Sequence, residues 1–285
     1  MGSSMAGQFL SHGFPTFVYS RTSSKAKNLL RDGAEWADSP GYLADKVDYV
    51  FSIVGYPDDV EEVYFGKNGI FSRSIEGTVL IDMTTSSPEL AERIYKHSRH
   101  KNAFSLDAPV SGGDIGAKNA SLAIMCGGDK EVFAKTLPLL ELLGKNIQYF
   151  GSPGSGQRTK MSNQILIAST MIGTVESLIY AENAKLDLQK VIDLIGKGAA
   201  GCWSLNQLGP RMIKNDWSPG FFVKHFIKDM GIALEDSKRM GIQLRGLELA
   251  NEFYNKVMNF GYSENGTQVL LKVLREMNIR SLDKK

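Results

Sequence analysis

Short apolar segments alternate with amphipathic ones through the first half of the chain, and this alternation restricts the fold more than any other feature. Apolar segments of strand length lie at 16–19, 49–54, 78–82, 104–107, 122–126 and 147–150. Segments with helical spacing lie between them, at 4–11, 25–31, 58–64, 88–100 and 130–143. We therefore expect a mostly parallel sheet covered by helices on both faces.

The pattern changes at Gln157. From Met161 to Ile179, apolar residues recur in steps of four and three, which is the spacing of a buried helix face. Further helical segments follow at 188–195, 204–212, 226–240, 247–259 and 267–277, and no strand is needed. The sequence thus predicts an α/β domain at 1–153 and an all-α domain at 154–285, with a long buried helix between them. We expect the active cleft where the two domains meet.

The composition is that of an ordinary globular protein, with 42% hydrophobic and 22% charged residues among 285. The net charge of +2 and the lack of a basic run disfavour nucleic acid as a partner. Cys126 and Cys202 lack the spacing of a zinc site, so no metal is expected. No apolar stretch approaches the ~20 residues of a membrane helix, and no secretory signal opens the chain. These features predict a cytoplasmic protein without a membrane partner, and they leave an organelle open.

The start of the chain departs from the usual pattern of a Rossmann-type dinucleotide-binding domain. Such a domain opens with a strand, a G-x-G-x-x-G turn and a helix whose N-terminus faces the pyrophosphate. Here Met1-Gly2 leads directly into a predicted helix, so Gly2 takes the place of the third glycine. The first strand and the first two glycines are missing. Either the sequence is incomplete or its cofactor binding is weakened, and the motifs further along the chain favour the first explanation.

The second strand of such a domain usually ends in a carboxylate that binds the ribose 2′-hydroxyl of NAD. Here the strand ends in Ser20-Arg21-Thr22, with no carboxylate to repel a 2′-phosphate. Arg21 is suited to pairing with that phosphate. We therefore predict that these three residues contact the cofactor and that NADP is preferred over NAD. The alternative is that Arg21 stacks on adenine or faces solvent.

Lys160 and Asn163 are the residues that suggest chemistry. Their side chains share one face of a predicted helix, because they lie three residues apart. A lysine beside a cleft can give or take a proton, and an amide can orient a hydroxyl or a carboxylate. Ser111, Gly112 and Gly113 follow a predicted strand end, and the glycines let a substrate carboxylate approach the backbone amides. The plainer alternatives are a solvated lysine and a simple tight turn.

Asp107 to Gly113, Gly154 to Gln164 and Lys228 to Ala233 are three separated motifs. Together, in this order, they resemble the 3-hydroxyisobutyrate dehydrogenase family of β-hydroxyacid dehydrogenases, which includes tartronate semialdehyde and glyoxylate/succinic semialdehyde reductases. The resemblance covers nearly the whole chain. It implies NAD(P)-dependent hydride transfer between nicotinamide and a small 3-hydroxy acid or its semialdehyde.

The resemblance also implies the roles of individual residues. Lys160 would act as general acid/base, and Asn163 would hold the substrate beside it. The implied substrate contacts are Ser111, Gly112, Gly113, Asn163 and Lys228. The implied cofactor contacts are Gly2, Ser20, Arg21, Thr22, Val54, Thr85 and Lys228.

Other interpretations stay open. A non-catalytic or cofactor-impaired relative, acting as a binding or scaffold protein, would account for the missing first strand. The presence of Lys160, Asn163 and Lys228 argues against it. A relative of 6-phosphogluconate dehydrogenase shares the architecture, but the helical domain is short and lacks an evident arginine cluster. The direction of the reaction is open, although NADP favours reduction, and the long apolar helices predict a homodimer or homotetramer.

Overall fold

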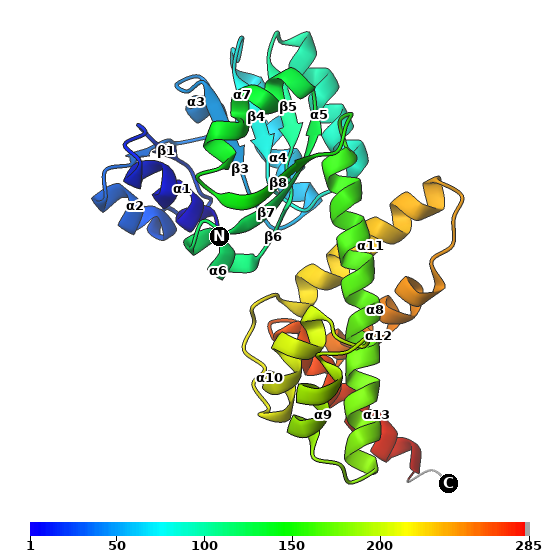
Figure 1. Cartoon of the computed structure of the whole chain (residues 1–285). Coiled ribbons are helices and arrows are strands. Elements are labelled where there is room, and N and C mark those ends of the chain that lie inside the picture. The colour runs from blue at the N-terminus through cyan, green and yellow to red at the C-terminus, as the bar shows by residue number, and fades with distance from the viewer. Residues whose placement is uncertain (283–285) are drawn as a thin grey trace. The chain divides into compact units, whose positions relative to one another are not determined.

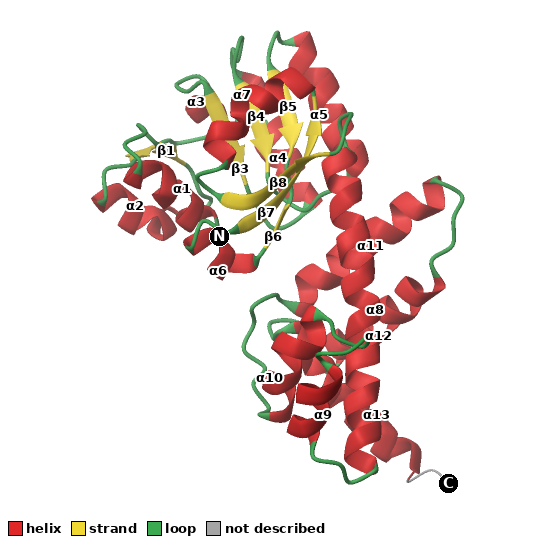
Figure 2. Ribbon diagram, viewed as in Figure 1, coloured by secondary structure: helices red, strands yellow, loops and turns green. Residues whose placement is uncertain are grey.

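The computed structural model describes residues 1–282 and divides into two compact units, Met1–Lys160 and Met161–Lys285 (Figure 1). Within the described residues, strands occur in the first unit and the second is helical (Figure 2). The observed class is therefore the expected one, an α/β dinucleotide-binding fold followed by helices. The division between the units falls inside a helix, after Lys160, so the predicted domain boundary at 153/154 stays a prediction.

The strands of the first unit form two separate sheets. The strands are β1 (Phe17–Val18), β2 (Glu35–Trp36), β3 (Tyr49–Ser52), β4 (Val79–Asp82), β5 (Phe104–Asp107), β6 (Val110–Ser111), β7 (Leu122–Gly128) and β8 (Gly144–Tyr149). β1 pairs only with β2, in parallel. The larger sheet has the order β3-β4-β5-β7-β6, with β8 also paired to β7. Its pairs β3–β4, β4–β5 and β7–β8 are parallel, whereas β5–β7 and β6–β7 are antiparallel.

Helices and short 3-10 segments surround these strands. They are α1 (Gly2–Ser11), η1 (Ser23–Ala26), α2 (Lys27–Arg31), α3 (Pro40–Ala44), α4 (Pro57–Phe65), η2 (Ile70–Ser72), α5 (Pro88–His100), α6 (Gly113–Lys118) and α7 (Lys130–Leu140). The short elements β2, β6, α3 and α6 were not predicted. A strand or helix of so few residues shows no periodicity, so the chain around it determines its conformation.

β4 shows why helices cover both faces of the larger sheet. All four of its residues are buried, and successive side chains of a strand point to opposite faces. Val79 and Ile81 belong to a core with α1 and α7, whereas Leu80 belongs to a second core with α4 and α5. A parallel sheet covered on both sides reads as a continuous apolar run, which is the pattern predicted for 78–82.

β1 and β2 have a small core of their own, formed by Val18, Ala26, Leu29 and Ala34. No described residue joins β1 to β3 in a strand ladder. The pairing of strands is therefore interrupted between β1 and β3, which correspond to the predicted strands at 16–19 and 49–54. In a Rossmann-type sheet the first strand lies between these two.

The second unit begins within α8 (Ser155–Asn183). Its other elements are α9 (Leu188–Ile195), η3 (Ser204–Leu208), α10 (Gly209–Ile213), α11 (Val223–Arg239), α12 (Arg245–Asn259), η4 (Thr267–Val269) and α13 (Leu270–Leu282). The predicted helix at 204–212 is divided, because Ser204–Leu208 forms a π-helical segment before α10 begins. Such segments are rare and frequently lie at functional sites.

α8 is less buried than its sequence predicted. Met161, Ala168, Met171, Val175 and Leu178 lie in the core of the second unit. The opposite face is exposed, with Leu166 at 65% and Tyr180 at 75%. By length and composition α8 also qualifies as a membrane span, contrary to the expectation that no stretch of the sequence is long and apolar enough. The core helix of a soluble protein passes the same test.

Candidate active site

Polar residues end three neighbouring strands of the larger sheet in register. Ser52 of β3 lies opposite Asp82 of β4, and Asp82 lies opposite Asp107 of β5. All three are buried. The carboxyl ends of parallel strands are where open α/β sheets bind their ligands. The candidate site is therefore built from the residues that follow these strands.

Asp82 organises the end of β4 through a buried hydrogen-bond network. Ser52 Oγ donates to Asp82 Oδ1 at 2.9 Å, so Tyr64, whose hydroxyl lies 2.9 Å from Ser52 Oγ, is the donor to that serine. The Thr84 amide donates to the same carboxylate oxygen at 3.1 Å. Burial raises the pKa of Asp82 to about 6, against the lowering effect of these hydrogen bonds.

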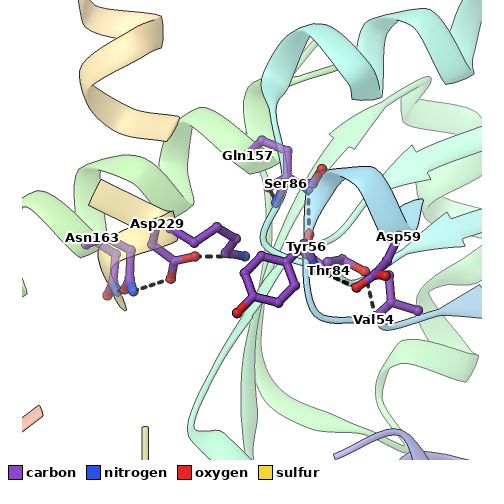
Figure 3. A network of polar contacts seen from close by, with 10 residues as sticks. Val54, Tyr56, Asp59, Thr84, Ser86, Gln157, Asn163 and Asp229 are labelled. Carbon is purple, nitrogen blue, oxygen red and sulfur yellow. Dashed lines mark hydrogen bonds and ion pairs between the residues drawn. The ribbon is translucent and has the colours of Figure 1, made fainter. Parts of the chain in front are cut away.

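The network reaches the predicted cofactor residue Val54. Its backbone amide donates to Thr84 Oγ1 at 3.0 Å, which joins the end of β3 to the end of β4 (Figure 3). The Val54 amide is thus used within the protein, and a cofactor contact would come from its side chain or carbonyl. Thr85, the other residue predicted near the nicotinamide, is half-buried at the same end of the sheet.

Asp107 fixes the beginning of α8. Its two carboxylate oxygens accept hydrogen bonds from the Gly154 and Gln157 amides, each at 2.8 Å. A carboxylate at this position satisfies the unpaired amides of a helix N-terminus and interacts favourably with the helix dipole. Burial raises the pKa of Asp107, and the hydrogen bonds from Gly154 and Gln157 oppose that rise. Asp107 belongs to one of the three sequence motifs, but its role at the start of α8 was not predicted.

Gln157 connects the start of α8 to the end of β4. Its side-chain amide donates to the Thr84 carbonyl at 2.8 Å and accepts from the Ser86 amide at 2.9 Å (Figure 3). The residue is fully buried. Lys160 follows one helical turn later and is only 6% exposed, so the alternative of a solvated lysine is wrong.

Asn163 and Lys228 belong to the second unit, where they flank a buried carboxylate. Asn163 donates to Gln164 at 2.7 Å, and Gln164 donates to Asp229 Oδ2 at 2.7 Å. Lys228 Nζ lies 2.9 Å from Asp229 Oδ1, and the two side chains are 11% and 2% exposed. That oxygen has no conventional hydrogen bond, so the ion pair stabilises it. Lys228 is therefore not a solvated lysine, and the sequence missed the roles of Gln164 and Asp229.

Ser111, Gly112 and Gly113 lie together where β6 ends and α6 begins. Gly112 has φ of 127° and Gly113 has φ of 66°, which other residues adopt only with strain. The turn therefore depends on both glycines.

The predicted adenosine contacts lie beyond β1. Ser20 is half-buried, and Arg21 and Thr22 are exposed. Arg21 forms an ion pair at 2.8 Å with Asp59, in the first turn of α4. The expectation that no carboxylate opposes a 2′-phosphate needs correction, because Asp59 of a different element lies beside the guanidinium. The strand-end sequence does not contain this carboxylate, so it could not reveal it.

Two features fit a bound dinucleotide. α1 opens at Gly2 with no side-chain cap and no acidic residue in its first turn, which suits an anionic pyrophosphate. A side-chain carbon at Gly2 would lie 3.1 Å from Ile53, so the helix start lies against the end of β3. Ser86 Oγ, next to Thr85, is a buried polar atom without a hydrogen-bond partner among the described residues.

A metal site or another hollow would be a further candidate for a functional site. Among residues 1–282, no three histidine, cysteine or acidic side chains are grouped as a metal site would require. A surface hollow of about 430 Å³ is lined by residues that precede β3 and β4, including Asp48 and Thr78. It therefore lies at the amino ends of the strands, away from the candidate site.

The doubly covered sheet with polar strand ends, followed by a helical unit, is the architecture of a dinucleotide-binding fold with a helical second domain. Residues 1–151 match the family model described as the NAD binding domain of 6-phosphogluconate dehydrogenase. Residues 154–274 match the model described as NAD-binding of NADP-dependent 3-hydroxyisobutyrate dehydrogenase. The chain belongs to the 3-hydroxyisobutyrate dehydrogenase family of NAD(P)-dependent hydroxyacid dehydrogenases.

Individual relatives agree with this assignment. An uncharacterized oxidoreductase of Bacillus subtilis is 52% identical over 96% of this chain and 95% of its own length. The "Probable 3-hydroxyisobutyrate dehydrogenase-like 1, mitochondrial" of Arabidopsis thaliana is 49% identical over 98% of this chain and 83% of that protein. The solved structure of Mycobacterium tuberculosis 3-hydroxyisobutyrate dehydrogenase with L-serine has a TM-score of 0.88 at 25% identity, covering 96% of both chains.

Proposed function

We propose that this protein transfers hydride between nicotinamide and a small 3-hydroxy acid or its semialdehyde, with Lys160 as general acid/base and NADP preferred. The observation that carries the proposal is the burial of Lys160, 6% exposed, on a helix start attached to the carboxyl ends of the parallel strands β4 and β5. A buried amine needs a functional or structural reason, because lysine is almost never buried without one.

The substrate class is supported by the relatives. The mycobacterial enzyme was solved with L-serine, which is itself a 3-hydroxy acid. In this chain, Ser111 and the amides around Gly112 and Gly113 would bind the substrate carboxylate, because glycines allow close approach to the backbone. Asn163 would hold the hydroxyl or carboxylate oxygen, and Lys228 would add positive charge.

The cofactor would be held by Gly2 at the pyrophosphate, by Ser20, Arg21 and Thr22 at the adenosine, and by Val54, Thr85 and Lys228 toward the nicotinamide. Hydride transfer to or from carbon is the chemistry that the nicotinamide supplies when bound. Lys160 accepts the hydroxyl proton as the alcohol carbon is oxidised to a carbonyl. In the reverse direction the Lys160 ammonium gives that proton to the oxygen as the carbonyl is reduced.

Replacing Lys160 tests the proposal. We expect Lys160→Ala to lower kcat by about 10³-fold or more, because a positioned acid/base contributes about 10²–10⁴-fold. NADPH should still raise the melting temperature of the variant, since a ligand that binds only the folded state stabilises it. Lys190→Ala, which removes an exposed lysine of α9, is the matched control.

Near-normal turnover of Lys160→Ala would exclude the acid/base role. A panel of hydroxy acids and semialdehydes, assayed with NADP(H) and NAD(H), defines substrate and direction. If no compound turns over and NADPH gives no thermal shift, the protein is a non-catalytic relative instead.

A further inference from the structure

Gln157 holds the backbone on both sides of Thr85. Its side-chain Nε2 donates to the carbonyl of Thr84, and its Oε1 accepts from the amide of Ser86. The two bonds are 2.8 and 2.9 Å long, and the side chain is fully buried. A single amide thus fixes the carbonyl before Thr85 and the N–H after it. Only a side chain with both a donor and an acceptor can make this pair of bonds.

The rest of the first turn of α8 has little freedom to move. Asp107 accepts the amides of Gly154 and Gln157. Gly156 lies so close to the sheet that a side-chain carbon there would overlap the backbone carbonyl oxygens of Met125 and Asp107. These contacts seat the helix on the ends of β5 and β7. The contacts of Gln157 are the ones that extend this attachment to the end of β4.

Lys160 lies three residues after Gln157, on the same face of α8. We propose that Gln157 is a positioning residue, which fixes the Lys160 amine and the backbone at Thr85 relative to each other. This inference rests on the proposed function, because it needs Lys160 as the acid/base and Thr85 beside the nicotinamide. Gln157 would act through these neighbours, because both polar atoms of its side-chain amide bond backbone groups of the protein.

The chemical need for such a residue follows from geometry. Proton transfer at the substrate oxygen and hydride transfer at its carbon must be aligned at the same time. A displacement of about 1 Å can cost about 10²-fold in rate. A neutral amide performs the attachment without placing a charge beside the buried lysine, which a carboxylate would do.

The test compares Gln157→Ala with Arg158→Gln. The control removes another attachment of the same helical turn, the 2.9 Å ion pair between Arg158 and Glu92, whose side chains are 40% and 37% exposed. We expect Gln157→Ala to lower kcat by about 30- to 100-fold. The KM for the acid should change less than about threefold, because ground-state binding is kept. Arg158→Gln should keep kcat within about threefold of the wild type.

A double variant separates positioning from general loss of structure. If Gln157 acts through Lys160, adding Gln157→Ala to Lys160→Ala should lower the remaining rate by less than about threefold, because coupled residues are non-additive. The residual rates are measured in single-turnover reactions with enzyme in excess. Equal fold-losses in both backgrounds would show that Gln157 has only a structural role and would overturn the inference.

Gln157→Glu provides a second variant of nearly the same shape if Gln157→Ala does not fold. An ionised glutamate accepts but cannot donate to the Thr84 carbonyl, whereas a protonated one can. We expect kcat of Gln157→Glu, divided by that of the wild type, to rise at least tenfold as the pH is lowered from 8 to 5.5. A constant ratio would contradict the inference. Loss of activity in Lys160→Ala with normal kcat in all Gln157 variants would reject this inference alone, whereas an active Lys160→Ala would reject the proposed function.

Discussion

Arg21 shows how one residue can be suited to a ligand and still be restrained by its neighbour. Its side chain is 78% exposed, as an adenosine contact would be, yet it pairs with Asp59, which is 15% exposed. A 2′-phosphate would have to compete with Asp59 for the guanidinium. The proposed preference for NADP therefore depends on whether Arg21 binds the 2′-phosphate or Asp59 more strongly.

Substitutions at this pair should change the cofactor preference in opposite directions. Arg21→Gln should lower kcat/KM with NADPH about tenfold or more, because it removes a charged hydrogen bond of about 1.5–3 kcal/mol, and should leave NADH nearly unaffected. Asp59→Asn should raise the NADPH to NADH ratio up to about fivefold, the range of an exposed ion pair. An amide oxygen can still accept the Tyr56 amide that Asp59 now binds at 3.1 Å.

Asp58→Asn is the matched control, because it removes a neighbouring carboxylate from the same first turn of α4. A ratio that is insensitive to Arg21 and Asp59 would show that Arg21 does not meet the 2′-phosphate.

At the scale of elements, the packing of the start of α8 against the sheet decides where Lys160 lies. Its two glycines face opposite environments. A side-chain carbon at Gly156 would collide with two backbone carbonyls, whereas one at Gly173 would meet nothing within 4 Å. The same substitution should therefore have opposite effects at two positions of one helix.

We expect Gly173→Ala to raise the free energy of unfolding by about 0.5–1 kcal/mol, because alanine is the better helix former. Gly156→Ala should lower it by about 1–3 kcal/mol, since the helix start must move away from the sheet. Urea unfolding of both variants measures these changes. A stabilised Gly156→Ala would mean that the close approach of helix and sheet is not needed.

The sequence predicted the elements that bury periodic apolar faces. Segments 88–100, 104–107 and 188–195 agree residue by residue with α5, β5 and α9. It did not predict the function of Asp107, Gln157 or Asp229, because each depends on a partner that is distant in sequence. A polar residue within an apolar segment stands out in the sequence. Only the folded structure shows which distant residue it contacts.

At the scale of the whole molecule, the described residues of the second unit pack around one hydrophobic core, whereas those of the first unit form three. Asp82 lies under the strand ends of the first unit, fully buried, with its pKa raised to about 6 by burial. A carboxyl group with a higher pKa in the folded than in the unfolded protein holds its proton more tightly when folded. Its stabilising contribution is present below the unfolded pKa, near 4, and is lost as the pH rises through about 6.

The stability of the protein should therefore depend on pH through Asp82. On going from pH 7.5 to pH 5, the wild type should gain on the order of 1 kcal/mol in free energy of unfolding relative to Asp82→Asn. An asparagine oxygen can still accept from Ser52 and Thr84, so the variant loses the titration and keeps these hydrogen bonds. Urea unfolding at both pH values checks this. Parallel pH profiles for the two proteins would show that Asp82 has the same pKa folded and unfolded.

The small sheet formed by β1 and β2, with its separate core, has a practical consequence. The residues expected to distinguish NADP from NAD follow β1, whereas Lys160 and its attachments are built on β4, β5 and β7. In the proposed function, the residues that choose the cofactor and the residue that moves the proton thus belong to separately packed parts of the first unit, apart from Asp59 of α4, which pairs with Arg21. A graft of the segment 16–36 from a relative with a different coenzyme preference would therefore have to include position 59, and it would leave Lys160 and its attachments unchanged.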